Sequence, residues 1–125
     1  MTGGAGLDTG RVLALLFVAL TLGAGQLLFK LAAERLVIGR GAVALLVSFL
    51  SGPMLAALAL YALATVLWVY LLHGLELSRA YPFIAVAFAF VPLLAWLLLG
   101  ESLGLRYWAG LGVMIAGLYI ISTSI

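Results

Sequence analysis

The sequence of 125 residues contains no cysteine, a single histidine and very few charges. Without cysteine there is no disulfide, no thiolate metal site and no cysteine nucleophile, and one histidine cannot form a histidine metal cluster. Six Lys and Arg residues against four Asp and Glu give a net charge of +2 with no basic cluster, which excludes a typical nucleic-acid-binding protein. The sequence therefore predicts no metal, no cofactor and no nucleic-acid partner.

Apolar residues are what the chain has in abundance, at 67% of the sequence against 8% charged. Soluble domains are about 45–50% apolar and about 25% charged, and a small domain buries only about two-thirds of its chain surface. So much apolar surface is stable only in lipid. At this length we expect one domain, over residues 1–125.

Four long apolar runs are separated by short polar segments. A helix needs about 20 apolar residues to cross a bilayer, and the runs predict spans over about residues 12–33, 53–73, 80–99 and 107–123. Residues 41–50 are apolar but too few to cross, which predicts a short interfacial or re-entrant segment. The expected fold is an all-α membrane protein with four transmembrane helices.

Individual residues predict where these helices begin and bend. Asp8 or Thr9 can cap the first helix. Ser51 can cap the second, with Pro53 in its first turn, where a missing N–H costs nothing. Pro92 lies in the middle of the third span, where it frees a backbone carbonyl and predicts a kink.

The basic residues divide unevenly between the two ends of the predicted spans. Two of the six, Arg11 and Arg79, fall at one end, and the other four fall at the opposite end: Lys30, Arg35, Arg40 and Arg106. Cytoplasmic loops of membrane proteins carry an excess of Lys and Arg. This distribution predicts that the end with four bases is cytoplasmic and that both termini lie outside.

Gln26 and Lys30 are the strongest polar feature inside a span, and they lie on one helical face because they are four residues apart. Lys30 is about one turn from the helix end, so it is either an interfacial anchor or a cation that holds an anionic headgroup. Gln26 lies deeper in the span, where it can orient a ligand by hydrogen bonds.

Other polar and aromatic residues gather at the span ends. Glu101 can form an ion pair with Lys30 or with Arg106, and Glu76 can form one with Arg79. If Arg79 is not paired, it is a candidate for a phosphate clamp or for an anchor at the lipid headgroups. Five rings are candidates for the interfacial aromatic belts: Trp68, Trp96, Tyr107, Trp108 and Tyr119. Trp68 and Tyr70 lie closer to the core and can line a cavity. No nucleophile–base pair or phosphate loop is present, which favours transport or support of a partner membrane protein over catalysis.

Glycines in the last span suggest a contact between subunits. Gly110 and Gly117 lie seven residues apart on one face, and small residues let helices approach closely in lipid. The alternative is that glycine is simply frequent in membrane helices. Because four helices hardly enclose a pathway, we expect a dimer, with Gly110 and Gly117 in its seam.

Several segments resemble the drug/metabolite transporter superfamily, which includes EamA-like and small multidrug resistance-like proteins. The resemblance covers nearly the whole chain and lies in the segments 25–30 (GQLLFK), 80–82 (AYP) and 100–101 (GE), together with Trp108, Gly110 and Gly117. It implies a small bundle like that of the small multidrug resistance family, and a dimer. That family exports cations by means of a glutamate in the middle of its first helix, where this sequence has Leu22.

A second branch of the superfamily resembles this chain more closely: the subunits of the 4-amino-4-deoxy-L-arabinose-phosphoundecaprenol flippase. The match includes Gly25-Gln26 with Lys30, Leu67-Trp68, Ala80-Tyr81-Pro82 and Arg106-x-Trp108-x-Gly110. It implies movement of a polyprenyl-phosphate-linked sugar from the cytoplasmic to the periplasmic leaflet of the bacterial inner membrane, for lipid A modification and polymyxin resistance. The chain departs from this branch at Arg79 and in a longer first loop.

We therefore predict a flippase, or one subunit of it, that works as a homodimer or with a homologous subunit. Lys30 and Arg106 are expected to capture the phosphate, with Glu101 beside them, and Arg79 to receive it on the far side. The groove between them is expected to contain Gln26, Trp68 and Tyr81. The alternatives are a small-molecule or drug exporter of the same fold and a non-transporting subunit that supports a glycosyltransferase.

Overall fold

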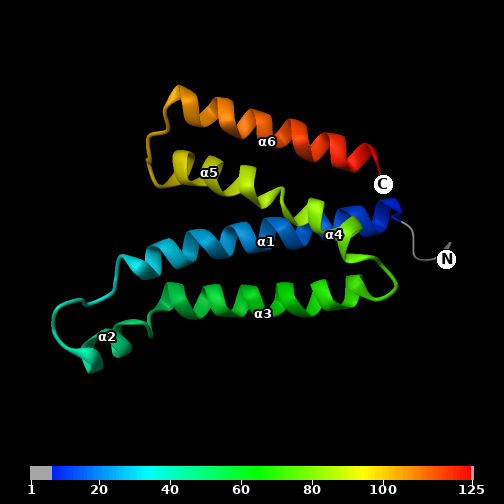
Figure 1. Cartoon of the computed structure of the whole chain (residues 1–125). Helices are drawn as coiled ribbons and strands as arrows, with labels where there is room; N and C mark the ends of the chain where they lie inside the picture. The colour runs from blue at the N-terminus through cyan, green and yellow to red at the C-terminus, as the bar shows by residue number, and fades with distance from the viewer. Residues whose placement is uncertain (1–6, 125) are drawn as a thin grey trace.

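A computed structural model describes residues 7–124, and Figure 1 shows a bundle of helices with no strand in this range. The helices are α1 (Thr9–Ala33), α2 (Ala42–Ser48), α3 (Gly52–Leu72), α4 (Leu77–Ile84), α5 (Ala87–Leu98) and α6 (Leu105–Thr123). Four helical segments are long and apolar enough to cross a membrane: Thr9–Ala33, Gly52–Leu72, Leu77–Leu98 and Leu105–Thr123. The predicted all-α fold with four transmembrane helices is confirmed.

Two helix starts are fixed by side chains that accept hydrogen bonds from the first helical turn. The Oδ1 atom of Asp8 accepts the backbone N–H of Arg11 at 2.8 Å, and α1 begins at the next residue after Asp8. The Oγ atom of Ser51 accepts the backbone N–H of Met54 at 3.4 Å, with proline in the first turn of α3. Both caps satisfy N–H groups that have no partner within the helix.

The longest helix, α1, lies at the centre of the bundle and packs most extensively against α3, with further contacts to α4 and α5 (Figure 1). The core is small, and six of its buried residues form one cluster: Leu15, Val18, Ala64, Leu71, Leu75 and Ala80. Glycine lets two aromatic rings approach α1. A Cβ atom at Gly23 would lie 2.5 Å from the ring of Phe90, and one at Gly25 would lie 2.5 Å from the ring of Tyr61.

The third span differs from its prediction. It begins at Leu77 rather than at residue 80, and it is interrupted at Ala85 and Val86, whereas α5 continues through Pro92. At the interruption the N–H of Val86 donates to the carbonyl of Phe83 at 3.3 Å, and that of Phe88 to the carbonyl of Ala85 at 2.9 Å. These three-residue bonds tighten the backbone locally. The interruption lies before Pro92, and the kink at Pro92 itself stays a prediction.

The short helix α2 occupies part of the segment predicted to be interfacial. It covers Ala42–Ser48 rather than residues 41–50. The Oγ atom of Ser48 accepts the N–H of Val37 at 2.9 Å and donates to the carbonyl of Leu45 at 2.6 Å, which ties the helix to the loop before it. Val43 and Leu46 are exposed, and their location at the membrane interface stays a prediction.

The last helix, α6, is loosely attached to the bundle. None of its residues is buried, and Figure 1 shows it on the far side of α5 from α3. It contacts α4, and on α5 the ring of Trp96 meets that of Trp108 edge to face with centroids 5.6 Å apart. Much of the inward face of α6 is therefore open.

The helices run so that charged residues collect at two opposite ends of the bundle. The start of α1 and the end of α6 lie together at one end, here called the terminal end; α2 and the α5–α6 connection lie at the other, the α2 end (Figure 1). The α2 end contains four bases and two acids: Lys30, Arg35, Arg40, Arg106, Glu34 and Glu101. The predicted grouping of bases is confirmed, whereas the membrane orientation stays a prediction.

Candidate transport groove

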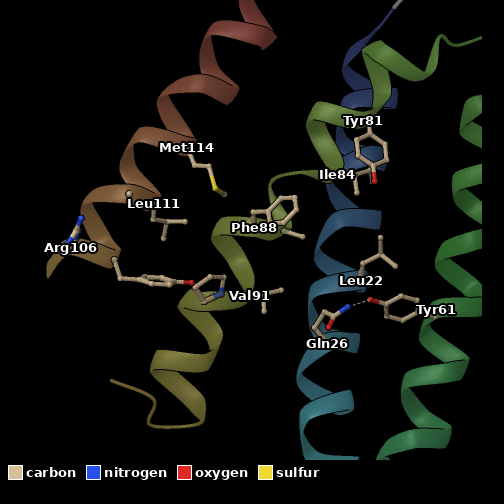
Figure 2. Close-up of a pocket in the computed structure, with 14 residues that line it drawn as sticks. Leu22, Gln26, Tyr61, Tyr81, Ile84, Phe88, Val91, Arg106, Leu111 and Met114 are labelled. Carbon is tan, nitrogen blue, oxygen red and sulfur yellow. Dashed lines mark hydrogen bonds between the residues drawn. The ribbon is translucent and has the colours of Figure 1, made fainter. Parts of the chain in front are cut away.

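A groove of about 740 Å³ lies between α6 and α5 on one side and α1 and α4 on the other, with one residue contributed by α3 (Figure 2). Its lining is mostly apolar. Five polar or amphipathic side chains interrupt that lining: Gln26, Tyr61, Tyr81, Arg106 and Tyr107. The groove is open at the surface of the single chain, since Phe88 in its lining is 63% exposed.

Gln26 and Tyr61 form the polar centre of the groove. The Nε2 atom of Gln26 donates to the hydroxyl of Tyr61, and Figure 2 shows the two side chains pointing toward one another from α1 and α3. The Tyr61 ring lies over Gly25 and contacts Phe29, with ring centroids 5.0 Å apart. At about 1.5 Å of rise per residue, both polar groups lie about 10–14 Å from the α2 end of their helices. They are thus inside the bilayer, where such groups need partners.

Arg106 lies in the first turn of α6 and forms part of the groove lining, and Figure 2 shows its guanidinium on the side of α6 that is turned away from α5. The described residues 7–124 contain a single ion pair, in which the Oε1 atom of Glu76 lies 3.1 Å from the Nε atom of Arg79. The pairing predicted for Glu76 is confirmed. Both alternatives for Glu101, a pair with Lys30 or with Arg106, are wrong, so the charge of Arg106 is available to a ligand.

A second, smaller cavity of about 190 Å³ adjoins the groove toward the terminal end. It lies between α1, α3 and α4 and shares Leu22, Tyr81 and Ile84 with the groove. Trp68 lines it and meets Tyr81 edge to face, with ring centroids 6.2 Å apart. Both rings lie about 6 Å from the terminal end at about 1.5 Å per residue. Polar groups therefore recur along the depth of the bundle, from Arg106 through the Gln26–Tyr61 pair to Tyr81.

Of the residues predicted to bind substrate, the structure brings Gln26, Tyr81 and Arg106 together in the groove and places Trp68 in the adjoining cavity. Three others lie outside the lining of both cavities: Lys30, Arg79 and Glu101. The expectation that Tyr70 lines a cavity is wrong, because Tyr70 is 75% exposed on another face of α3.

The two glycines of the predicted seam occupy different surroundings. Gly110 lines the groove, and a Cβ atom at either Gly110 or Gly117 would have no atom within 4 Å. Both positions are therefore open in the single chain, and their place in a dimer seam stays a prediction.

Tyr61 is the one polar residue of the groove centre that the sequence reasoning missed. It lies in the middle of an apolar run, where a tyrosine hydroxyl needs a partner. It is also seven residues before Trp68, and residues seven apart share a helical face. The sequence could have indicated this pair, because it has a tyrosine in the middle of one span, on the helical face of Trp68, and a glutamine in the middle of another.

A family model for the EamA-like transporter family matches residues 11–123. The chain belongs to this family. It is 38% identical over 69 residues to a protein of Escherichia coli O81 (strain ED1a) named a probable 4-amino-4-deoxy-L-arabinose-phosphoundecaprenol flippase subunit ArnE, a match that covers 55% of this chain and 62% of the relative. A protein of the same name from Klebsiella pneumoniae (strain 342) is 34% identical over 59 residues, which cover 47% of this chain and 53% of that protein.

These matches thus span between about half and two-thirds of the curated relatives' length. No solved structure matches the chain. The predicted superfamily is confirmed, and so is the prediction of a transport protein rather than an enzyme. With four spans in the described residues, this EamA-like chain is a multi-pass membrane protein.

Proposed function

We propose that this EamA-like chain moves the headgroup of a polyprenyl-phosphate-linked sugar, such as aminoarabinose, across the bacterial inner membrane. The supporting observation is a cation, Arg106, that has no ion-pair partner among residues 7–124 and belongs to the lining of a groove whose interior polar groups are all neutral. The planar guanidinium fork matches phosphate in geometry as well as in charge. The names of the similar proteins from Escherichia coli and Klebsiella pneumoniae point to the same class of substrate.

The chemistry of the lining supports a lipid substrate. The groove is apolar and open at the surface, so a polyprenyl tail can stay in the bilayer while the headgroup alone enters. Gln26, Tyr61 and Tyr81 offer the headgroup hydrogen bonds in place of water. Such replacement lowers the cost of carrying a polar group through hydrocarbon.

The distribution of acids favours an anionic substrate over the cationic drugs of an exporter. All four carboxylates lie outside the helices, at their ends or in loops: Asp8, Glu34, Glu76 and Glu101. Leu22, at the place where the cation exporters have glutamate, lines both cavities. A cation would meet no counter-charge along the groove.

In the proposed direction, Lys30 and Arg106 capture the phosphate at the cytoplasmic α2 end, with Glu101 nearby, and the headgroup passes Gln26 toward Tyr81 and Trp68. A second subunit, identical or homologous, covers the open face of α6, with Gly110 and Gly117 at the contact. This arrangement would supply a sugar for lipid A modification and hence for antibiotic resistance.

The test measures headgroup translocation in proteoliposomes that contain undecaprenyl-phosphate aminoarabinose. The amino group of the sugar is detected when it becomes exposed to a membrane-impermeant amine reagent. We expect the wild-type chain, with its partner subunit if one is needed, to accelerate exposure over empty vesicles. Arg106→Gln removes a charged hydrogen-bond donor worth about 1.5–3 kcal/mol, so the rate falls about ten- to a hundredfold.

Arg35→Gln is the matched control, because Arg35 lies at the same end but outside the groove lining; its rate should equal that of the wild type. Exposure no faster than in empty vesicles, with or without a homologous subunit, would contradict the proposal. Native mass spectrometry of gently extracted protein adds a second readout: bound polyprenyl phosphate supports the flippase, whereas a stable complex with a glycosyltransferase and no lipid supports a non-transporting subunit.

A further inference from the structure

Arg11 is a basic residue that lies where its charge does not stabilise the fold. Its Nη1 atom is buried and has no hydrogen-bond partner among residues 7–124, the only such side-chain atom in that range. A buried donor without a partner costs free energy, and a charged one costs more. Arg11 also lies in the first turn of α1, where the helix dipole is unfavourable to a cation.

Neighbouring acids do not compensate for this charge. The Asp8 carboxylate accepts the backbone N–H of Arg11 at 2.8 Å and forms no ion pair with its guanidinium. The other acid of the terminal end, Glu76, is paired with Arg79. Among the described residues of this end, the guanidinium of Arg11 is thus the cation without an ionic partner.

Arg11 is not in the lining of either cavity, but it lies on the face of α1 that contributes residues to both. Val18 lines the smaller cavity, Leu22 lines both, and Gln26 lines the groove. At about 100° per residue, Arg11 and these three residues fall within about 80° of one another on the helix surface. The same face of α1 therefore has a polar residue near each end, about 22 Å apart at about 1.5 Å per residue, with the two cavities between them.

We propose that Arg11 is the residue that binds the phosphate at the terminal end of the pathway and receives it after Tyr81. This role rests on the proposed function, and it replaces the one predicted for Arg79, whose guanidinium is already engaged by Glu76. An anion arriving from the smaller cavity supplies the acceptor that the buried Nη1 atom lacks. The ligand class is a phosphate monoester or diester on a lipid.

The experiment compares Arg11→Met with the wild type in two assays. Methionine keeps an unbranched apolar stem and removes the charge. In proteoliposomes, headgroup exposure should slow at least about tenfold, the effect of losing one charged hydrogen bond. In detergent, the thermal unfolding midpoint should stay equal or rise, because a buried donor atom without a partner is removed. A residue with a merely structural role would lower the midpoint. Arg11→Lys should restore part of the rate.

A binding measurement decides the matter even if the chain does not translocate lipid. In the Arg106→Gln background we expect residual binding of farnesyl phosphate by calorimetry, and the further change Arg11→Met should abolish it. No residual binding, or residual binding unaffected by Arg11→Met, overturns the role of Arg11. A translocation rate that falls with Arg79→Gln but not with Arg11→Met also overturns it. A wild-type chain that binds farnesyl phosphate through Arg11 but moves no lipid would leave the anion site standing and remove the proposed flippase function.

Discussion

Replacing Gly25 with alanine should disrupt the contact between α1 and α3 on which the groove is built. Gly25 is buried, and a methyl group there would lie 2.5 and 2.8 Å from two ring carbons of Tyr61. Ordinary contact begins at 3.4 Å, so the ring must retreat by about 1 Å, a displacement typical of overpacked cores. That movement pulls the Tyr61 hydroxyl from Gln26 and the ring from Phe29.

The magnitude follows from three opposing contributions. Overpacking costs about 1–3 kcal/mol, and loss of the Gln26–Tyr61 hydrogen bond costs about 0.6–1.7 kcal/mol in a membrane protein. Alanine regains about 1 kcal/mol of helix propensity over glycine. We therefore expect Gly25→Ala to lower the free energy of unfolding by about 1–3 kcal/mol.

The assay is unfolding in mixed micelles with increasing dodecyl sulfate, followed by circular dichroism. Gly112→Ala is the matched control, since a methyl there meets no atom within 4 Å; it should be neutral or stabilising by up to about 1 kcal/mol. In a Tyr61→Leu background the cost of Gly25→Ala should shrink, because the ring is gone. A Gly25→Ala chain as stable as the control would refute the packing described for α1 and α3.

Two further predictions concern the groove and its orientation. A double-mutant cycle of Tyr61→Phe and Gln26→Leu should give a coupling energy of about 0.6–1.7 kcal/mol in the same unfolding assay; additive effects would mean that the hydrogen bond contributes nothing. Reporter fusions at the two termini should both report the outside of the cell, as expected from the four bases at the α2 end; a cytoplasmic C-terminus would reverse the proposed direction.

The spans were predictable because a bilayer imposes a length and an apolar composition on any helix that crosses it. Gln26, Tyr81 and Arg106 were predictable as site residues because each is polar or amphipathic within or beside an apolar run. Which side of α3 faces the groove was not predictable, because apolar residues cover every side of this helix and leave no periodicity to interpret. Trp68 and Tyr70, two residues apart, are about 200° apart on the helix, so they cannot both face one cavity.

The interruption of the third span was beyond the reach of sequence reasoning for a different reason. Proline shows where a backbone N–H is missing, and Pro92 was the obvious candidate for a kink. The structure interrupts the helix at Ala85 and Val86, between Pro82 and Pro92, where the hydrogen bonds shift to three-residue spacing. Packing against α1 follows closely on the interruption, because the ring of Phe90 lies against Gly23, and the sequence alone does not show that contact.

The charges of the two ends bear on how the proposed transport would be driven. The α2 end contains four bases and two acids, whereas the terminal end contains two of each. A phosphate is therefore attracted more strongly to the end where it enters than to the end where it leaves, and this difference alone opposes export. No carboxylate lies within a span to bind a proton and couple its movement to transport. The remaining driving forces are consumption of the lipid on the far side and the membrane potential, worth about 2.3 kcal/mol per charge at 100 mV. A single unpaired cation at the exit, such as Arg11, suits such a carrier, since it receives the anion without the excess charge that would retain it.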